Sequence, residues 1–213
     1  MKKNSSDIPL VMFAKAPIAG QVKTRLTPHC SYEQAAAIAE ILLQESLSKV
    51  VKYWPGQVYL SIWQYNEHPF VKSMIERFNI ELLSQVEGDL GAKMLSTFYQ
   101  LEGPAAIMGC DAPLVSEGAL KLAHTLLSDD QNVIGPSEDG GYYLIGLSEP
   151  KDILFDGVSW GHDSVLKETL KLATTNHIEL HKLPTSFDID HWTDVLRASK
   201  QLPTLHTYID TIK

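Results

Sequence analysis

The feature that most constrains the fold is a short apolar run, residues 10–13, that leads directly into a segment unable to continue a strand. That segment, residues 14–26, reads AKAPIAGQVKTRL. Pro17 lacks a backbone N–H and Gly20 tolerates positive φ, so the chain must turn here. A strand followed by a glycine-containing loop is typical of open α/β sheets, in which ligands bind at the carboxyl ends of the strands. We therefore predict that this loop lies at the ligand-binding edge of a sheet.

The end of the same loop carries two cations, Lys23 and Arg25, on either side of Thr24. Arginine offers a planar fork of donors and lysine a mobile point charge, and both suit a bound polyphosphate. The alternative is an ordinary surface loop with solvated charges. With one glycine, the segment is neither a P-loop nor a dinucleotide-binding fingerprint.

Strand-like and helix-like segments alternate along the rest of the chain. Apolar or β-branched runs predict strands at 58–63, 80–83, 105–108, 133–136, 142–147 and 178–183. Helical patterns occupy 32–53, a stretch from Pro69 to Phe78, 92–101, 117–127, a stretch after Ser164 and the tail from 202 to 213. This alternation is typical of a largely parallel sheet, and 213 residues suit one α/β domain spanning residues 1–213.

Three aspartates stand out by their position. Asp111 follows the apolar strand at 105–108, where a hard-metal ligand would be placed, although aspartate is also common as a cap or turn residue. Asp188 and Asp190 share one side of an extended segment, with Phe187 and Ile189 on the other side. Two carboxylates on one face repel unless a cation is nearby, which points to a metal or a basic side chain.

Two further glycine-containing stretches are candidate ligand contacts. Gly91 precedes Lys93 in the first turn of a predicted helix, where a cation opposes the helix dipole; this suggests an anionic partner, or simply a solvated lysine. Asp139, Gly140 and Gly141 separate two predicted strands and favour a tight reversal before Tyr142. A ligand can also lie against such a backbone, and the two interpretations are compatible.

Composition narrows the class of protein. A formal net charge of -8 argues against a general nucleic-acid binder. Residues 1–9 lack the apolar core of a signal peptide, and no apolar stretch approaches membrane-spanning length. Cys30 and Cys110 have no CxxC spacing, so we expect free thiols in a cytoplasmic protein.

The residue inventory also limits the chemistry. The chain has no G-x-S-x-G nucleophile elbow, and its two cysteines and eight histidines form no combined Cys/His zinc motif. Cys110 beside Asp111 is a poor activated thiol, because the carboxylate raises its pKa. Metal-assisted chemistry at a phosphate is the mechanism that remains, with Lys23 and Arg25 stabilising charge on the leaving group.

The motifs taken together resemble the DUF2064 family, which is grouped with the GT-A-like nucleotide-diphospho-sugar transferases. They are FAKAP and GQVKTRL in the first loop, then GDLGAKM, GCDAPL, GPSEDGGYYLIGL, WGHDSVL and FDIDHWTD, in that order. The resemblance implies a three-layer α/β/α sandwich with a mixed, mainly parallel sheet. It also implies a divalent metal, Mg²⁺ or Mn²⁺, on Asp111, with Asp190 as the better second ligand and Asp188 as the next. Lys93 stands where the family usually has arginine, which keeps the charge but loses the bidentate fork.

The same resemblance assigns the remaining site residues. Lys23, Arg25 and Asp111 are the expected catalytic residues. Nucleotide contacts are expected from Ala14, Lys15, Ala16, Pro17, Gly20, Lys23, Arg25, Gly91 and Lys93. The acceptor or sugar side is expected at Asp139, Gly140, Gly141 and Tyr142.

The expected activity is a metal-dependent transfer from a nucleotide sugar or an NTP to a small-molecule acceptor. Glycosyl transfer and nucleotidyl transfer with release of pyrophosphate both stay open at this point. A third reading is a catalytically silent nucleotide-binding module. Unpaired sheet edges would allow a homodimer.

Overall fold

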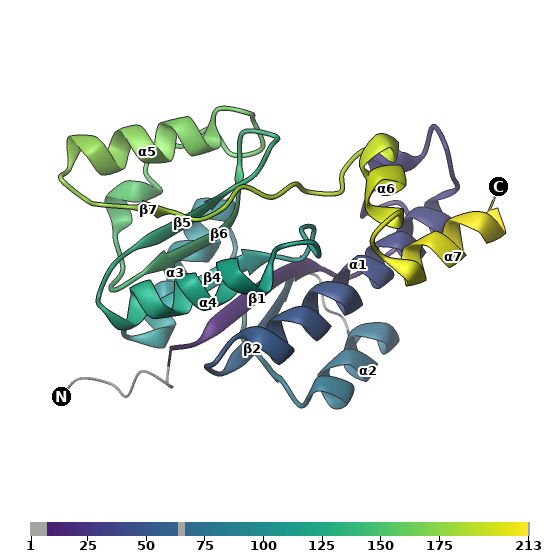
Figure 1. The fold of residues 1–213 in the computed structure, drawn as a ribbon, viewed down its shortest axis with the longest axis horizontal. Coiled ribbons are helices and arrows are strands. Elements are labelled where there is room, and N and C mark those ends of the chain that lie inside the picture. The colour runs from purple at the N-terminus through teal and green to yellow at the C-terminus, as the bar shows by residue number, and fades with distance from the viewer. Residues whose placement is uncertain (1–7, 64–66, 213) are drawn as a thin grey trace.

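The computed structural model describes residues 8–63 and 67–212, whose strands form a single seven-stranded sheet with helices on both faces (Figure 1). The strand order is β3-β2-β1-β4-β6-β5-β7, and in the described residues β6 runs antiparallel to its neighbours β4 and β5 while the other pairs are parallel. The strands are β1 Leu10–Lys15, β2 Val58–Trp63, β3 Glu81–Leu82, β4 Ala105–Gly109, β5 Val133–Pro136, β6 Tyr142–Leu147 and β7 His181–Lys182. The mixed, mainly parallel sheet predicted from the family resemblance is therefore confirmed.

Helices cover both faces and one end of this sheet. They are α1 Tyr32–Tyr53, α2 Pro69–Phe78, α3 Leu90–Leu101, α4 Glu117–Ser128, α5 Val165–Thr175, α6 Trp192–Ser199 and α7 Pro203–Ile212, with short 3₁₀ turns η2 Thr24–Leu26 and η3 Asp152–Leu154. One apolar cluster joins the sheet to α1, α2 and α4. A second joins its other face to α3 and α5. These clusters make the three layers of the predicted sandwich.

A third apolar cluster lies beyond the sheet and matters most for the site. It packs α6 and α7 against the first turns of α1 and against Leu26 of η2 (Figure 1). Phe187 and Ile189 are buried in the same cluster, so the segment leading into α6 is anchored there. The predicted alternation of residues 187–190, with the aspartates facing the other way, follows from this anchoring.

Several elements begin where local chemistry dictates. The Ser31 hydroxyl accepts a hydrogen bond from Gln34 N, and Gln34 Oε1 accepts one from Ser31 N at 2.8 Å, so the predicted capping box starts α1. Pro69 occupies the first turn of α2, where its missing N–H costs nothing. The reversal between β5 and β6 places Gly140 at φ +90°, as the Asp-Gly-Gly pattern predicts.

Two predicted strands and one helix start differ from the structure. The strand predicted at 178–183 pairs only at His181–Lys182, and the one predicted at 80–83 only at Glu81–Leu82. Both are edge strands, whose pairing stops where their single neighbour leaves them. Helix α3 begins at Leu90 rather than Ala92, because the Asp89 carboxylate caps it by accepting from Ala92 N at 2.8 Å.

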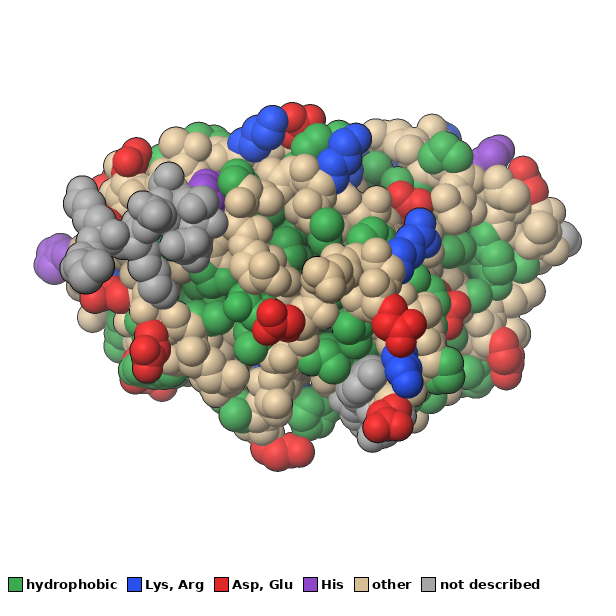
Figure 2. Space-filling model, turned by 90° about the horizontal axis from the view of Figure 1, so that it is seen from below, with side chains coloured by type: hydrophobic (Ala, Val, Ile, Leu, Met, Phe, Trp, Pro, Cys, Tyr) green, Lys and Arg blue, Asp and Glu red, His purple; other side chains and the backbone are tan. Residues whose placement is uncertain are grey.

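No helix in the described ranges is both long and apolar enough to traverse a bilayer. Cys30 and Cys110 are both free thiols, as predicted. On the face seen in Figure 2, basic and acidic side chains of the described residues are interspersed.

Candidate active site

A pocket of about 660 Å³ opens at the carboxyl ends of β1, β2 and β4. This is the edge at which open α/β sheets bind ligands, and the volume suits a nucleotide-sized molecule. The residues around it come from the first loop, the ends of the three strands, α1, the start of α3 and the segments before α3, α5 and α6. They are Phe13, Ala14, Lys15, Gln21, Val22, Lys23, Thr24, Arg25, Ala39, Leu43, Trp63, Gln85, Leu90, Lys93, Gly109, Cys110, Asp111, Trp160, Gly161 and Asp190.

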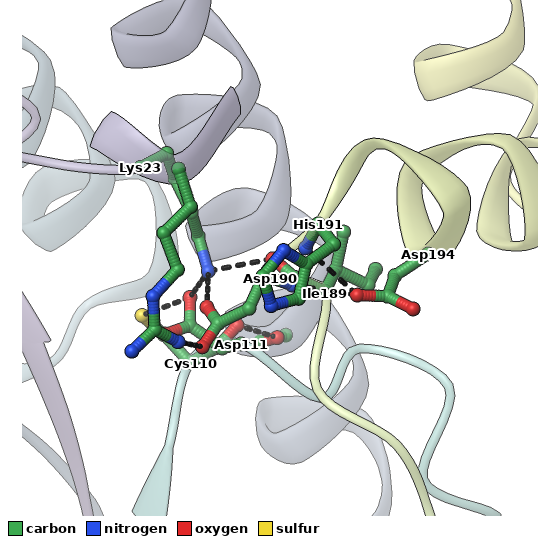
Figure 3. Close-up of polar contacts among 9 residues, drawn as sticks. Lys23, Cys110, Asp111, Ile189, Asp190, His191 and Asp194 are labelled. Atoms are coloured by element: carbon green, nitrogen blue, oxygen red, sulfur yellow. Dashed lines mark hydrogen bonds and ion pairs between the residues drawn. The ribbon is translucent and has the colours of Figure 1, made fainter. Parts of the chain in front are cut away.

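Lys23 is the most constrained side chain of this pocket. Its backbone is left-handed, with φ 47° and ψ 34°, a conformation that a non-glycine residue adopts at some cost. The turn directs the side chain inward, where 6% of it remains exposed. Its ammonium group reaches three oxygens, Asp111 Oδ1 at 2.8 Å, Asp190 Oδ1 at 2.9 Å and the carbonyl oxygen of Ile189 at 2.7 Å (Figure 3).

The two aspartates are held in place by the backbone. Asp111 follows the end of β4, and its carbonyl oxygen accepts a hydrogen bond from Ile189 N at 2.9 Å, which ties the two distant segments together. Asp194, in the first turn of α6, accepts from His191 N at 2.7 Å and from Asp190 N at 3.3 Å. The carboxylates of Asp111 and Asp190 therefore meet at one point, although the sequence separates them widely.

The charges at this point support one another. Burial alone would lower the pKa of Lys23, but attraction to Asp111 and Asp190 and the hydrogen bonds to both raise it above its ordinary value. Burial works against ionisation of Asp190, yet Lys23 and Arg25 lower its pKa below the ordinary value. Arg25 contributes from the solvent side, with one guanidinium nitrogen 3.1 Å from Asp190 Oδ2. Lys23 and Asp190 therefore form an ionised pair at neutral pH.

A second group of acids lies beside Asp111. Burial, reinforced by the charges of Asp111, Asp139 and Asp190 and opposed by the Ser137 hydroxyl, raises the pKa of Asp188 to about 7. Asp139 itself is exposed, and its Oδ1 accepts from Gly141 N at 2.9 Å within the turn between β5 and β6. Within the described residues, no ion pair joins a basic side chain to Asp139 or Asp188, whereas Lys23 pairs with Asp190.

An ion pair holds that turn against the 187–190 segment. Arg197 of α6 makes two hydrogen bonds to the Glu138 carboxylate, at 2.6 and 2.9 Å, and its guanidinium lies 3.8 Å from the Phe187 ring centroid. Planar pairing of this kind restricts both partners. The turn carrying Asp139 and the segment carrying Asp188 and Asp190 are thereby joined.

The opposite wall of the pocket is aromatic and basic. Lys93 Nζ lies 3.4 Å from the centroid of the Trp63 ring, and burial together with nearby Lys15 lowers the Lys93 pKa. Trp160 covers the start of α3, where a Cβ on Gly91 would come within 2.7 Å of its ring. Gly91 therefore leaves room for the Trp160 ring. Trp160 lines the pocket, and Gly91 does not.

The structure brings together most of the predicted first-loop and metal residues. Ala14, Lys15, Lys23, Arg25, Lys93, Asp111 and Asp190 line the pocket. Ala16, Pro17, Gly20, Gly91, Asp139, Gly140, Gly141, Tyr142 and Asp188 are not among the lining residues. Tyr142 has its hydroxyl enclosed on the α3 and α5 side of the sheet, where burial raises its pKa. Gly140 packs against the backbone of Asp163, where an added Cβ would lie 2.0 Å from the carbonyl oxygen.

Sequence reasoning missed the aromatic part of the site. Trp63 ends the second parallel strand, so its position at the ligand-binding edge follows from the same rule that identified the first loop. Trp160 lies within the WGHDSVL motif, but nothing in its local pattern indicates that it reaches across to α3. Gln85, which donates to Ser61 O at 2.9 Å, was also missed.

The oxygens around Lys23 suit a hard divalent cation. Two carboxylates and a backbone carbonyl are ligands that Mg²⁺ and Mn²⁺ accept, and here they converge within 2.7–2.9 Å of one point. In residues 8–63 and 67–212, no cluster of three or more His, Cys, Asp or Glu side chains has a metal-holding arrangement; two carboxylates meet here, with Lys23 between them. The donor set fits the metal, and the lysine occupies the same point.

Comparison with known proteins identifies the fold and then the family. The chain has the nucleotide-diphospho-sugar transferase fold. It superposes on a protein provisionally named a nucleotide-diphospho-sugar transferase, from Desulfovibrio desulfuricans G20, with a TM-score of 0.79 and 23% identity over 94% of this chain and 97% of that one. The family model described as "Uncharacterized protein conserved in bacteria (DUF2064)" matches residues 46–162, more than half of the chain, and the chain belongs to this family.

Two further solved structures share the fold at lower identity. One is 4-diphosphocytidyl-2C-methyl-D-erythritol synthase from Anaerococcus prevotii DSM 20548, with a TM-score of 0.60 and 12% identity over 93% of this chain and 97% of that one. The other is Rv0371C of Mycobacterium tuberculosis H37Rv in complex with manganese, with a TM-score of 0.55 and 18% identity over 90% and 97%. The search of curated proteins returned no match to this chain.

Proposed function

We propose that this protein is a metal-dependent transferase that takes a nucleotide sugar or an NTP as donor and a small molecule as acceptor. The observation that carries the proposal is the convergence of Asp111, Asp190 and the Ile189 carbonyl on one point at the rim of the pocket. Such a point beside a pocket of nucleotide size is where the diphosphate of a donor would be held.

Each part of the pocket has a role in this proposal. The base and ribose occupy the region between the first loop, Trp63 and Trp160, and the phosphates extend toward Lys23 and Arg25. Asp111 and Asp190 hold a divalent ion, which when bound neutralises the diphosphate charge. The chain's own cations stabilise charge on the leaving group, so catalysis comes mainly from positioning and electrostatics.

The acceptor would approach from the other side of Asp111. Asp111 and Asp139 lie close enough to Asp188 for their charges to raise its pKa, and Asp139 and Asp188 lie outside the pocket lining. The Glu138–Arg197 pair restricts the turn that carries Asp139. A fixed carboxylate there suits an acceptor hydroxyl or phosphate that must be oriented toward the donor.

The names of the structural neighbours agree with this class. One is provisionally a nucleotide-diphospho-sugar transferase, one is a diphosphocytidyl synthase and one was crystallised with manganese. Nucleotidyl transfer is the second candidate, because Lys23 and Arg25 give the first loop the two cations with which such enzymes would grip a triphosphate.

One assay separates the two reactions. The purified protein is incubated with Mn²⁺ or Mg²⁺, a panel of NTPs and nucleotide sugars, and a mixture of small-molecule acceptors that carry hydroxyl or phosphate groups; released pyrophosphate and nucleoside diphosphate are quantified separately. Pyrophosphate from an NTP indicates nucleotidyl transfer, and nucleoside diphosphate from a nucleotide sugar indicates glycosyl transfer. Asp111→Asn should abolish whichever product appears. Release of neither product across the panel contradicts both reactions.

Nucleotide titration addresses the third reading, a silent binding module. Binding that strengthens when Mn²⁺ is added favours the transferase, since donor phosphates and the ion then share Asp111 and Asp190. Binding that is the same with metal or with EDTA favours the silent module.

A further inference from the structure

The ammonium of Lys23 occupies the point where the oxygen ligands of the site converge. Its three N–H groups have three acceptors, Asp111 Oδ1, Asp190 Oδ1 and Ile189 O, at 2.7–2.9 Å. The side chain is 6% exposed, so the group is enclosed rather than solvated. This buried ammonium, with three oxygens within 2.9 Å, therefore takes the place that a bound cation would occupy.

A divalent ion and this ammonium are mutually exclusive on the same oxygens. Mg²⁺ binds oxygen ligands at about 2.0–2.1 Å in octahedral geometry. An ion that took Asp111 Oδ1, Asp190 Oδ1 and the Ile189 carbonyl oxygen as ligands would compete directly with the Lys23 nitrogen, because that nitrogen lies 2.7–2.9 Å from the same three atoms. Repulsion between the two cations adds to the steric conflict.

The backbone of Lys23 offers a route out of this position. Lys23 begins the 3₁₀ turn η2 in a left-handed conformation, and its side chain makes no capping hydrogen bond. The conformational strain of Lys23 is relieved if its backbone leaves the left-handed region for a conformation with negative φ. Lys23 also lines the pocket, with exposed Thr24 and Arg25 directly after it, so a released side chain has open space in front of it.

We propose that Lys23 and a divalent cation are alternative occupants of the Asp111–Asp190 site, and that metal binding releases the Lys23 ammonium into the pocket to meet a ligand phosphate. The inference rests on the proposed function, because it takes the pocket to receive a metal-bound nucleotide. Metal alone then binds weakly, since it must displace an ammonium with three partners. Metal and nucleotide bind cooperatively, since the phosphate supplies the displaced lysine with a new partner.

The test measures Mn²⁺ binding, by electron paramagnetic resonance of the free ion, without nucleotide and then with a non-hydrolysable NTP analogue. Lys23→Met removes the competing ammonium. Arg25→Gln is the matched control, because it removes a charge from the same Asp190 carboxylate without touching the convergence point. We expect Lys23→Met to tighten Mn²⁺ binding about tenfold or more and Arg25→Gln to change it less than threefold, the range of a single exposed ion pair. We also expect the cooperativity between Mn²⁺ and nucleotide to disappear in Lys23→Met.

The results that overturn the inference are distinct. Unchanged or weaker Mn²⁺ binding in a folded Lys23→Met protein overturns it, as does an equal gain in Arg25→Gln, which would reflect charge alone. If wild-type protein binds no Mn²⁺ even with the NTP analogue but Lys23→Met does, the competition for the two carboxylates stands, but the release of Lys23 and the metal dependence of the proposed function both fail. If Mn²⁺ behaves as expected but no nucleotide binds, the release of Lys23 stands and the proposed function fails.

A measurement on the unaltered chain covers the case in which Lys23→Met does not fold. The enclosed Lys23 ammonium should give a slowly exchanging NH₃⁺ signal in ¹⁵N-lysine NMR spectra, assigned with Lys23→Arg. We expect this signal to vanish as Mg²⁺ is titrated in, because the released group exchanges with water. A signal that persists at saturating Mg²⁺ overturns the inference.

Discussion

Replacing Gly91 with alanine tests how tightly Trp160 is held over the pocket. Gly91 is the second residue of α3, and an added Cβ would lie 2.7 Å from Trp160 Cζ2 and 2.8 Å from Cε2 and Nε1. Ordinary carbon contacts begin near 3.5 Å, so the ring must shift by about 0.8 Å. The ring is rigid and is stacked on Phe155, with centroids 6.4 Å apart, which limits retreat in that direction.

The expected magnitude combines two opposing effects. Overpacking a filled site costs about 1–3 kcal/mol, while exchanging glycine for alanine in a helix gains up to about 1 kcal/mol. Gly91→Ala should therefore lower the free energy of unfolding by about 0–2 kcal/mol. The displaced indole should also weaken nucleotide binding, by about tenfold if one contact of about 1.4 kcal/mol is lost.

Gly118 provides a matched control at the second residue of α4. An added Cβ there has Ser116 Oγ at 4.0 Å as its nearest neighbour, so Gly118→Ala keeps the helix gain without a clash. It should be more stable than the wild type by up to about 1 kcal/mol. Urea unfolding gives the stabilities, and titration followed by tryptophan fluorescence gives the nucleotide affinity. Equal stability and equal affinity of the two variants would refute the packing argument.

Three other substitutions give separate tests. Asp188→Asn should stabilise metal-free protein at pH 8 by up to about 4 kcal/mol and have little effect near pH 4, with urea unfolding in EDTA as the assay. The sign follows because the pKa of Asp188 is about 7 in the folded protein and 3.8 ordinarily, so the wild type loses stability as the pH rises from about 4 to 7. A wild-type free energy of unfolding that does not change over this pH range contradicts the prediction. Ser31→Ala should lower the free energy of unfolding by about 1 kcal/mol, because it removes the α1 cap, and Ser31→Gly should lower it by only a few tenths of a kcal/mol. Thermal unfolding that ranks the two variants in the opposite order argues against the capping box. Gly140→Ala combines φ +90° with a Cβ 2.0 Å from Asp163 O, so it should cost more than about 2 kcal/mol in urea, and wild-type stability would exclude the packing described.

Local rules account for most of the fold. Three features act within a few residues and could therefore be predicted from the sequence. They are the capping box at Ser31, the proline at the start of α2 and the glycines after Asp139. The edge strands β3 and β7 were predicted too long, because the extent of pairing depends on a neighbouring strand rather than on the segment itself.

Some residues of the site could be predicted from the sequence, because their position depends on the strand that precedes them. Polar residues that follow buried strands lie at the ligand-binding edge, and this rule places Lys23 and Asp111 correctly at the pocket. It does not say which way a side chain points. Lys23 was expected to face a phosphate, and in the structure it faces two carboxylates.

The sequence by itself determined the alternation of strands and helices, the turn after β1 and the residues available for chemistry. Only the tertiary structure decided that Lys23 and Asp190, 167 positions apart, meet beside Asp111, and that Trp160 reaches across to α3. The physical reason is that periodicity and caps report interactions within a few residues, whereas the convergence of distant side chains depends on how α6 and α7 pack against the start of α1.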